Sequence, residues 1–232
     1  MTKMQKAVEA YKETFGFDTE PVELHPDLEA SLVETELFGT MLKHPLVFDA
    51  FYVKGMYDKR LNEMLRSRQE AVNKAFVEKE WPSYIFLHER PYRLDAFVDI
   101  EEHLGDAEYW EFLANVWTDT ENAWQNLDVW RKLWNSFRTR PPLELPVDTR
   151  FVTIYRGVRD LTHDGLSWTL NRDSAKWFGN RFGSGYLLEA TVLTSDILFY
   201  SNERNEEEVL LNAVNKISVT PVPEQRHKNS KD

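Results

Sequence analysis

Three consecutive glutamates, Glu206, Glu207 and Glu208, stand at the start of EVLLN, an apolar segment typical of a buried strand. Side chains alternate between the two faces of a strand, so Glu206 and Glu208 are predicted to share one face and Glu207 to lie on the other. Two neighbouring carboxylates repel each other, which favours a solvated turn unless other residues need the pair.

Arg156 is the last residue on the apolar face of another predicted strand. In FVTIYRG, Arg156 shares a predicted face with Val152 and Ile154, and Gly157 follows directly. An arginine in an apolar setting needs an anionic partner, because an unpaired buried guanidinium is costly. The partner is either one of the 39 acidic residues of the chain, in a salt bridge, or a phosphate that accepts from both arms of the guanidinium. Gly157 would let a ligand approach the backbone closely.

Two hydroxyl side chains precede a short predicted helix. In GLSWTLNRDSAKWFGNRF, Ser167 and Thr169 are two residues apart, so their hydroxyl groups share a face if this segment is a strand. The helix is expected over about residues 172–180, with Asn171 or Asp173 as its N-cap. By themselves, two hydroxyl groups on a strand before a capped helix are common.

Taken in chain order, these motifs resemble the arginine–serine–glutamate class of ADP-ribosyltransferases. The resemblance rests on an aromatic-Arg-Gly strand end, an S-x-T strand and an E-x-E strand start, and it spans about residues 151–222. EEEVLLN is similar to the E-x-E strand of clostridial binary toxins. The chain departs from the family's S-T-S motif, because Trp168 stands in the middle and Thr169 at the end. Trp168 is predicted to point to the opposite strand face, so the motif is expected to tolerate it. Residues 1–140 carry no such resemblance.

The resemblance implies NAD as a co-substrate, no metal, and a role for each motif residue. Glu208 would stabilise the ribose cation that forms when the nicotinamide–ribose bond breaks, and Glu206 would act as general base on the attacking group. Arg156 would bind the pyrophosphate, and the Gly157 backbone would face the nicotinamide amide. Ser167 would form a hydrogen bond either with the nicotinamide ribose or with Glu208.

Five further residues complete the implied site. Thr169 would brace its strand. Trp177 and Phe178 are candidates to stack on nicotinamide, with anchoring of the short helix in the core as the alternative. Phe199 and Tyr200, in the segment before the glutamates, are the candidates to recognise the acceptor.

The implied activity is mono-ADP-ribosyl transfer from NAD to a macromolecule. Protein arginine is the expected acceptor, because a glutamate at the position of Glu206 accompanies arginine acceptors in the family. An NAD glycohydrolase, with water as the acceptor, would use the same site. A non-catalytic interaction module on the same fold is a third possibility.

The pattern of the chain predicts an α+β fold in two parts. Residues 1–140 are expected to be helical and to serve as a cover or for target recognition. Apolar stripes predict helices at Met4–Phe15, over Tyr57–Phe76 with an end near Pro82, and over Trp110–Phe137, where two helices meet at a T-x-x-E capping box from Thr118. Pro26 suits the first turn of a further helix that runs to about Leu42. After the breaker-rich RTRPPLELP, residues 141–232 are expected to form a mixed β-sandwich with an ADP-ribosyltransferase-like core and a frayed tail from about 224. Its predicted strands are FVTIYR, YLLEATVL, ILFYS, EVLLN and KISVTPV. The bulky tryptophans of Trp110–Phe137 are interpreted as a core face, not as a ligand platform.

Composition narrows the class of protein. The net charge of −11 over 232 residues argues against a general nucleic-acid binder. The chain has no cysteine, and its six histidines show no metal-ligand spacing, so neither a disulfide nor a metal site is expected. No apolar run approaches the roughly 18 residues of a membrane span, and the N-terminal segment has no apolar signal-peptide region. We therefore expect a soluble cytoplasmic protein that does not engage membranes, and delivery into a host cell stays open.

Overall fold

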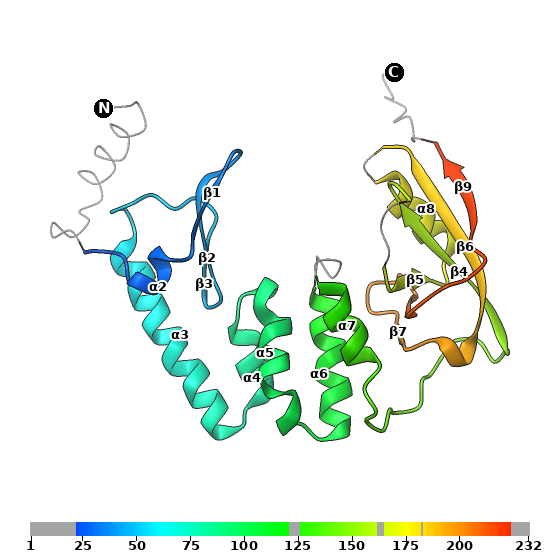
Figure 1. Ribbon diagram of the computed structural model, residues 1–232, viewed down its shortest axis with the longest axis horizontal. Helices are drawn as coiled ribbons and strands as arrows, with labels where there is room; N and C mark the ends of the chain where they lie inside the picture. Colours follow the sequence, from blue (N-terminus) through cyan, green and yellow to red (C-terminus); the bar gives the residue numbers. More distant parts are fainter. Residues whose placement is uncertain (1–21, 121–125, 162–164, 182, 224–232) are drawn as a thin grey trace, which may run out of the picture. The chain divides into compact units, whose positions relative to one another are not determined.

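The protein has an α+β fold with helices and two antiparallel sheets. A computed structural model describes residues 22–120, 126–161, 165–181 and 183–223, and the chain divides into two compact units, residues 1–121 and 122–232 (Figure 1). The division falls at Glu121/Asn122 and not near residue 140. Helix α7 (Leu127–Trp134), which the sequence pattern groups with the N-terminal helices, therefore belongs to the β-rich second unit.

The first unit combines a small sheet with a set of helices (Figure 1). Its described elements are α2 (Pro26–Glu29), β1 (Leu32–Thr35), β2 (Gly39–His44), β3 (Val47–Asp49), α3 (Asp58–Glu78), α4 (Trp81–Leu87), η1 (Arg90–Tyr92), α5 (Arg93–Ile100), η2 (Glu101–His103) and α6 (Asp106–Asp119).

A helix begins at Pro26 as predicted, but the predicted extent to about Leu42 is wrong, because the sheet of the first unit occupies those residues. Helix α2 ends at Glu29, and β1, β2 and β3 follow as an antiparallel sheet in that order. The Thr35 hydroxyl accepts from the Phe38 N–H and donates to the Gly39 carbonyl, and Gly39 has a φ of 69°. This turn reverses the chain between β1 and β2, so turn chemistry limits the helix that Pro26 begins to a single turn.

Helix α3 follows its predicted stripe. Leu61 and Leu65 are buried in one apolar cluster with Leu42 of the sheet. The helix stops before Lys79, which takes a left-handed conformation and closes the helix end with its N–H, so the predicted end near Pro82 is close.

The predicted aromatic core face is confirmed for four tryptophans. Trp110 and Trp117 of α6 and Trp130 and Trp134 of α7 are at most 6% exposed. Phe137, which the same stripe includes, is fully exposed because α7 ends before it at Trp134.

The two helices of this stripe meet close to the predicted junction, but their caps differ from the prediction. Helix α6 ends one residue after Thr118, which lies inside the helix, and the N-cap of α7 is Asn126. Glu121, the last residue of the predicted capping box, lies outside the described residues. A glutamate cap is present at the other end of α6, where the Glu108 carboxylate accepts from the Gly105 N–H at 3.0 Å.

The second unit is built on a six-stranded sheet in the order β7-β8-β5-β4-β6-β9, with every neighbouring pair antiparallel. Besides α7, its described elements are β4 (Phe151–Val158), β5 (Ser167–Thr169), α8 (Arg172–Asn180), β6 (Gly185–Leu193), η4 (Thr194–Asp196), β7 (Phe199–Ser201), β8 (Glu208–Leu210) and β9 (Ser218–Val222). All of the strands predicted after residue 141 are confirmed, as is the short helix with Asn171 as its cap. The stripe Met4–Phe15 and the tail from about 224 lie outside the described residues.

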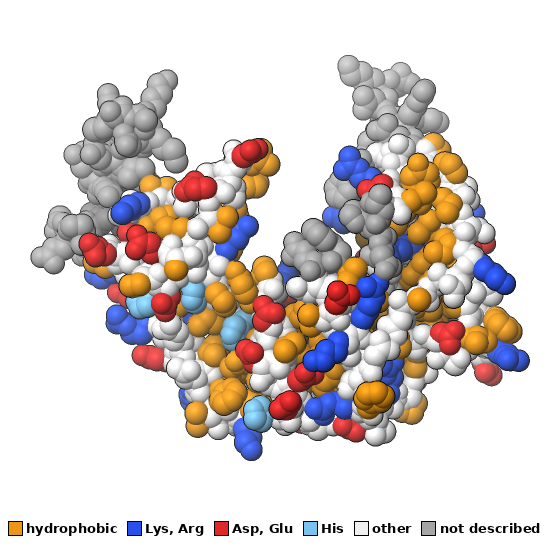
Figure 2. Space-filling view, viewed as in Figure 1, with side chains coloured by type: hydrophobic (Ala, Val, Ile, Leu, Met, Phe, Trp, Pro, Cys, Tyr) orange, Lys and Arg blue, Asp and Glu red, His pale blue; other side chains and the backbone are white. Residues whose placement is uncertain are grey.

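One face of this sheet carries the core of the second unit. Its members are Ile154, Trp168, Ala190, Val192, Ile197, Val209 and Leu211. Within the part of the chain that the structure describes, no helix has the length and apolar character that a membrane crossing requires. Figure 2 shows acidic side chains distributed over the first unit, on its strands and on its helices.

Candidate functional site

The six-stranded sheet opens between its two central strands. Strand β4 pairs with β6 along its whole length, and β5 pairs with β8 through all three of its residues. Between β4 and β5, however, the register contains a single pair, Tyr155 with Thr169. Beyond that pair the two strands continue with different partners, so the edges of β4 and β5 diverge from each other.

A pocket of about 200 Å³ occupies this opening. It is lined by residues of β4, β5, α8, the segment before β8 and β8 itself: Tyr155, Arg156, Gly157, Ser167, Trp168, Thr169, Ala175, Phe178, Glu206 and Glu208. The structure therefore brings together the arginine, serine and glutamate motifs, which are separated by up to about fifty residues in the sequence.

The serine and the second glutamate of the pattern are hydrogen-bonded. The Ser167 hydroxyl donates to Glu208 Oε1 at 2.6 Å. In the register of β5 and β8, Thr169 lies opposite Glu208 and Ser167 opposite Leu210, so Ser167 and Glu208 are diagonal neighbours on one face. A hydroxyl that donates to a carboxylate fixes its direction and favours its charged form. Glu208 is thereby held at the pocket wall.

Glu206 reaches the pocket by a different route from the predicted one. Strand β8 begins only at Glu208, so strand alternation does not determine where Glu206 points. Glu207 has a left-handed backbone with a φ of 48°, and this residue turns the chain between the two pocket carboxylates. Glu206 and Glu208 both line the pocket, and Glu207 is absent from its lining.

The segment before β8 is fixed by hydrogen bonds to its backbone. The Thr169 hydroxyl donates to the Glu206 carbonyl and accepts from the Asn171 N–H at 2.9 Å. The Asn202 side-chain oxygen accepts from the Glu207 N–H at 3.2 Å. Thr169, 7% exposed, thus braces this segment as well as its own strand.

Arg156 lines the pocket from the other face of the sheet. It follows Tyr155 in β4 and pairs with Leu188 of β6, so alternation places it on the face of Ile154, as predicted. Its guanidinium packs against the backbone of Gly165: a Cβ atom built on that glycine would lie 2.2–2.5 Å from the guanidinium atoms. Only a glycine at this position leaves room for the arginine as it is placed.

Gly157 has a packing role that the sequence does not reveal. A Cβ atom at this position would lie 1.8 Å from the Ala175 carbonyl oxygen and 2.4 Å from the Gly179 backbone nitrogen, both in α8. The missing side chain therefore allows α8 to pack directly on β4. Gly157 also lines the pocket, so its backbone remains accessible to a ligand.

The two aromatic residues of α8 differ in their positions. Phe178 lines the pocket, whereas Trp177 is 54% exposed and carries the Arg181 guanidinium 5.3 Å above its ring. The two rings meet edge to face with centroids 5.0 Å apart. Since Phe178 is also 36% exposed, neither residue anchors α8 in the core, and that alternative is wrong.

Phe199 and Tyr200, the predicted acceptor-recognition residues, are absent from the pocket lining. The Phe199 ring lies 5.2 Å from the ring of Trp134 in α7. Tyr200 packs against the apolar core of the sheet. Burial, with the charge of Glu207 in addition, raises the pKa of Tyr200. Both side chains support β7 in the described structure.

Sequence reasoning missed four residues of this region, namely Tyr155, Trp168 and Ala175 of the pocket lining and Asn202 beside it. Tyr155 lines the pocket beside Arg156, and its position directly before the arginine was the available signal. Asn202 caps the turn before the glutamates, and the polar run SNERNEEE gives only a general turn signal for it.

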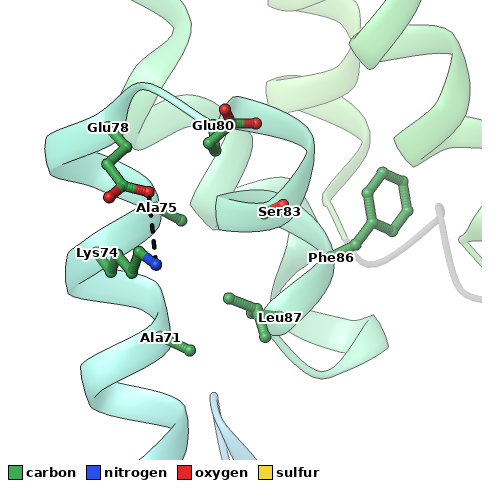
Figure 3. A pocket seen from close by; sticks show the side chains of 8 residues that line it. All are labelled: Ala71, Lys74, Ala75, Glu78, Glu80, Ser83, Phe86 and Leu87. Atoms are coloured by element: carbon green, nitrogen blue, oxygen red, sulfur yellow. Dashed lines mark ion pairs between the residues drawn. The ribbon is translucent and has the colours of Figure 1, made fainter.

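A larger pocket, of about 500 Å³, lies in the first unit between α3 and α4 (Figure 3). None of the predicted site residues contributes to it. Among the described residues, no group of three or more His, Asp or Glu side chains is arranged to hold a metal ion.

Comparisons of the chain with protein-family models, with curated proteins and with solved structures yield no match.

Proposed function

We propose that this protein is a mono-ADP-ribosyltransferase that uses NAD as the donor. The observation that carries the proposal is the hydrogen bond from Ser167 to Glu208 in a pocket that Arg156 and Glu206 also line. Four side chains whose order in the sequence resembles the arginine–serine–glutamate class thus surround one cavity. On this proposal the second unit has an ADP-ribosyltransferase-like fold.

The chemistry of the donor fits the charges of the pocket. NAD carries an anionic pyrophosphate, for which the planar guanidinium of Arg156 supplies a two-armed donor. A pocket of about 200 Å³ is smaller than the roughly 300–1,000 Å³ that encloses a drug-sized ligand. It therefore suits the nicotinamide and its ribose, and the adenosine end would lie along the open side. Of the two predicted stacking residues, Phe178 is the one that lines the pocket, and it is proposed to stack on nicotinamide.

Glu208 is proposed to stabilise the transition state of bond cleavage. The bond between the ribose C1′ and the nicotinamide nitrogen breaks, nicotinamide leaves with the bonding electron pair, and positive charge builds on the ribose. A carboxylate held in place by Ser167 stabilises that charge more than it stabilises uncharged ribose in the ground state.

Glu206 is proposed to serve the acceptor. An arginine guanidinium is protonated and a poor nucleophile, so it needs a carboxylate that orients it and accepts its proton as the new bond to C1′ forms. The left-handed turn at Glu207 allows both carboxylates to line one pocket. This arrangement is the reason for choosing protein arginine as the acceptor class.

Incubation of the protein with NAD labelled in its adenosine part, in a cell lysate and separately with a small guanidine compound, tests the proposal. We expect label on protein arginine and on the small guanidine, with release of nicotinamide. Free ADP-ribose without a labelled acceptor would identify a glycohydrolase. If calorimetry detects no NAD binding, the enzyme proposal fails and the non-catalytic interaction module is the supported alternative.

A further inference from the structure

The larger pocket of the first unit is a groove between two helices. Its α3 side consists of Ala71, Lys74, Ala75 and Glu78, a spacing of three and four residues that lies on one helix face. Its α4 side consists of Glu80, Ser83, Phe86 and Leu87. Figure 3 shows the two alanines pointing from α3 toward α4 and Leu87 pointing back toward α3. Because Ala71 and Ala75 are small, and the side chains of Lys74 and Glu78 are largely exposed, the α3 side does not fill the space between the helices.

The size of the groove matches a short helical segment. The α3 residues that line it cover 71–78, which corresponds to a length of about 10 Å. Two turns of an α-helix have this length, and such a segment would place two or three apolar side chains over Ala71, Ala75 and Leu87. Binding of an amphipathic helix in a groove of this kind is a common mode of peptide recognition.

The charge around the groove selects a basic occupant. Glu78 and Glu80 line it, and Lys74 is paired to Glu78 at 3.9 Å with side chains 71% and 53% exposed. An ion pair so exposed contributes little to stability, so a cationic side chain of a partner can replace Lys74 as the partner of the Glu78 carboxylate.

The composition of the first unit is acidic as well. Residues 1–121 hold 25 of the 39 acidic side chains of the chain and only 13 of its 28 basic ones. No lysine or arginine occurs between Arg93 and Arg131, a stretch that includes α5 and α6. The excess of acidic over basic residues in this protein therefore lies in the unit that holds the groove.

We propose that the groove between α3 and α4 binds an amphipathic basic helix of a partner protein. The apolar face of that helix would lie on Ala71, Ala75 and Leu87, and its lysine or arginine side chains would pair with Glu78 and Glu80. The acidic surface of the unit would speed the encounter with such a partner. This inference does not depend on the activity of the second unit.

The test uses the full chain and a fluorescein-labelled amphipathic peptide of leucine and lysine, about four helical turns long. Anisotropy should report saturable binding, and a peptide with glutamate in place of lysine should not bind. The double variant Glu78→Lys/Glu80→Lys should weaken binding about tenfold or more, because two attractive charges become repulsive. Ser83→Trp should weaken binding by a similar factor at unchanged net charge, because it fills an exposed position on the groove wall.

The matched control is Glu63→Lys/Glu111→Lys, which makes the same charge change at exposed positions of the first unit outside the groove. It should change the affinity less than about threefold, because these charges act only at long range. Circular dichroism checks that each variant is folded. Three results would each overturn the proposal: no binding by the parent, an equal loss in the control, or parent-like binding by Ser83→Trp.

Discussion

At the scale of single residues, the three glutamates at the start of β8 occupy three different environments. The Glu208 carboxylate accepts a hydrogen bond from the Ser167 hydroxyl. Glu206 lines the pocket, and its backbone carbonyl accepts a hydrogen bond from the Thr169 hydroxyl. Glu207 has the left-handed backbone that turns the chain between them. Substitutions that keep the shape but remove the charge should therefore have separate effects at the three positions.

If the proposed function holds, Glu208→Gln is expected to lower the rates of both NAD hydrolysis and transfer by about 10²–10³, because it removes the charge proposed to face the ribose cation. Glu206→Gln should suppress transfer to arginine and spare hydrolysis, since water needs less help from a base. Glu207→Gln should change neither activity. Measurement of nicotinamide release and acceptor labelling on all three variants checks this division. Equal loss of both activities in Glu206→Gln and Glu208→Gln would contradict it.

Asn202 is expected to act as a positioning residue for Glu206. Asn202→Ala removes the acceptor of the Glu207 N–H and, at about 1 kcal/mol for one hydrogen bond, should lower the ratio of transfer to hydrolysis about fivefold. Asn202→Asp keeps an oxygen at this position and should restore the ratio. Asn205→Gly is a control, because glycine readily adopts the left-handed φ of 56° found there. An unchanged ratio in Asn202→Ala would show that the turn does not depend on this side chain.

At the scale of secondary-structure elements, helix α8 is held to the sheet through glycines. Gly157 of β4 contacts the backbone of α8, and a Cβ atom at Gly185 of β6 would lie 2.2 Å from the Gly179 carbonyl oxygen. The helix that supplies Phe178 to the pocket is thus positioned by backbone contacts. Such contacts cannot be relieved by side-chain rotation.

Gly157→Ala should lower the free energy of unfolding by about 3 kcal/mol, at the upper end of the usual cost of overpacking, because its methyl group would overlap the Ala175 carbonyl. Urea unfolding measures this change. The same substitution at Gly105, where the nearest atom to an added Cβ is 3.5 Å away, should cost less than about 1 kcal/mol. If both variants lose the same stability, the close packing of α8 on β4 is not the cause.

His44 at the end of β2 should make stability depend on pH. Burial, the largest cause, lowers its pKa below the ordinary value of 6.5; the charge of Asp27 opposes this shift, and His25 and His88 add to it. Its Nδ1 accepts from the Leu46 N–H at 3.1 Å, a bond that protonation of Nδ1 would remove.

The sign follows from proton binding. Between the lowered pKa and 6.5 the unfolded chain binds more protons than the folded one, so stability falls as the pH drops below about 6.5. His44→Asn keeps an acceptor near the Nδ1 position without a titrating group. Urea unfolding at pH 7.5 and at 5.5 should show a smaller loss for the variant than for the parent. Parallel losses would assign the effect to other groups.

The elements of the second unit were predictable from sequence because each has a local signal. Its strands are short β-branched and aromatic segments, and Asn171 caps α8 as expected. The opening between β4 and β5 was not predictable, since it depends on which strands pair over long distances. The turn at Glu207 was missed for a similar reason: period-two alternation presumes a strand, and the strand begins one residue later.

At the scale of the whole molecule, the division at Glu121/Asn122 assigns α7 to the unit that holds the candidate site. Trp134 contacts Phe199, and the amide groups of Asn135 and Asn212 exchange hydrogen bonds of 3.0 and 2.6 Å. Arg140 donates to the Leu198 carbonyl at 2.8 Å. Helix α7 and the linker that follows it thus support strands β7 and β8.

A fragment of residues 122–232 should therefore fold and bind NAD, whereas one of residues 141–232 should aggregate or remain unfolded. The shorter fragment lacks α7 and leaves Phe199 without the ring of Trp134. Circular dichroism and calorimetric titration with NAD compare the two. Equal folding and binding by the shorter fragment would contradict the assignment of α7 to the second unit.

The single residue pair between β4 and β5 has a consequence for how the second unit opens and closes. Strands β7, β8 and β5 form one group, strands β4, β6 and β9 form another, and a single residue pair joins the two groups. The amide protons of the two groups should therefore exchange with solvent through separate opening events. A ligand bound across the opening, on Arg156 and on Glu208, would supply the missing connection. The two groups would then open together, and occupancy of the pocket would turn two weakly coupled folding units into one.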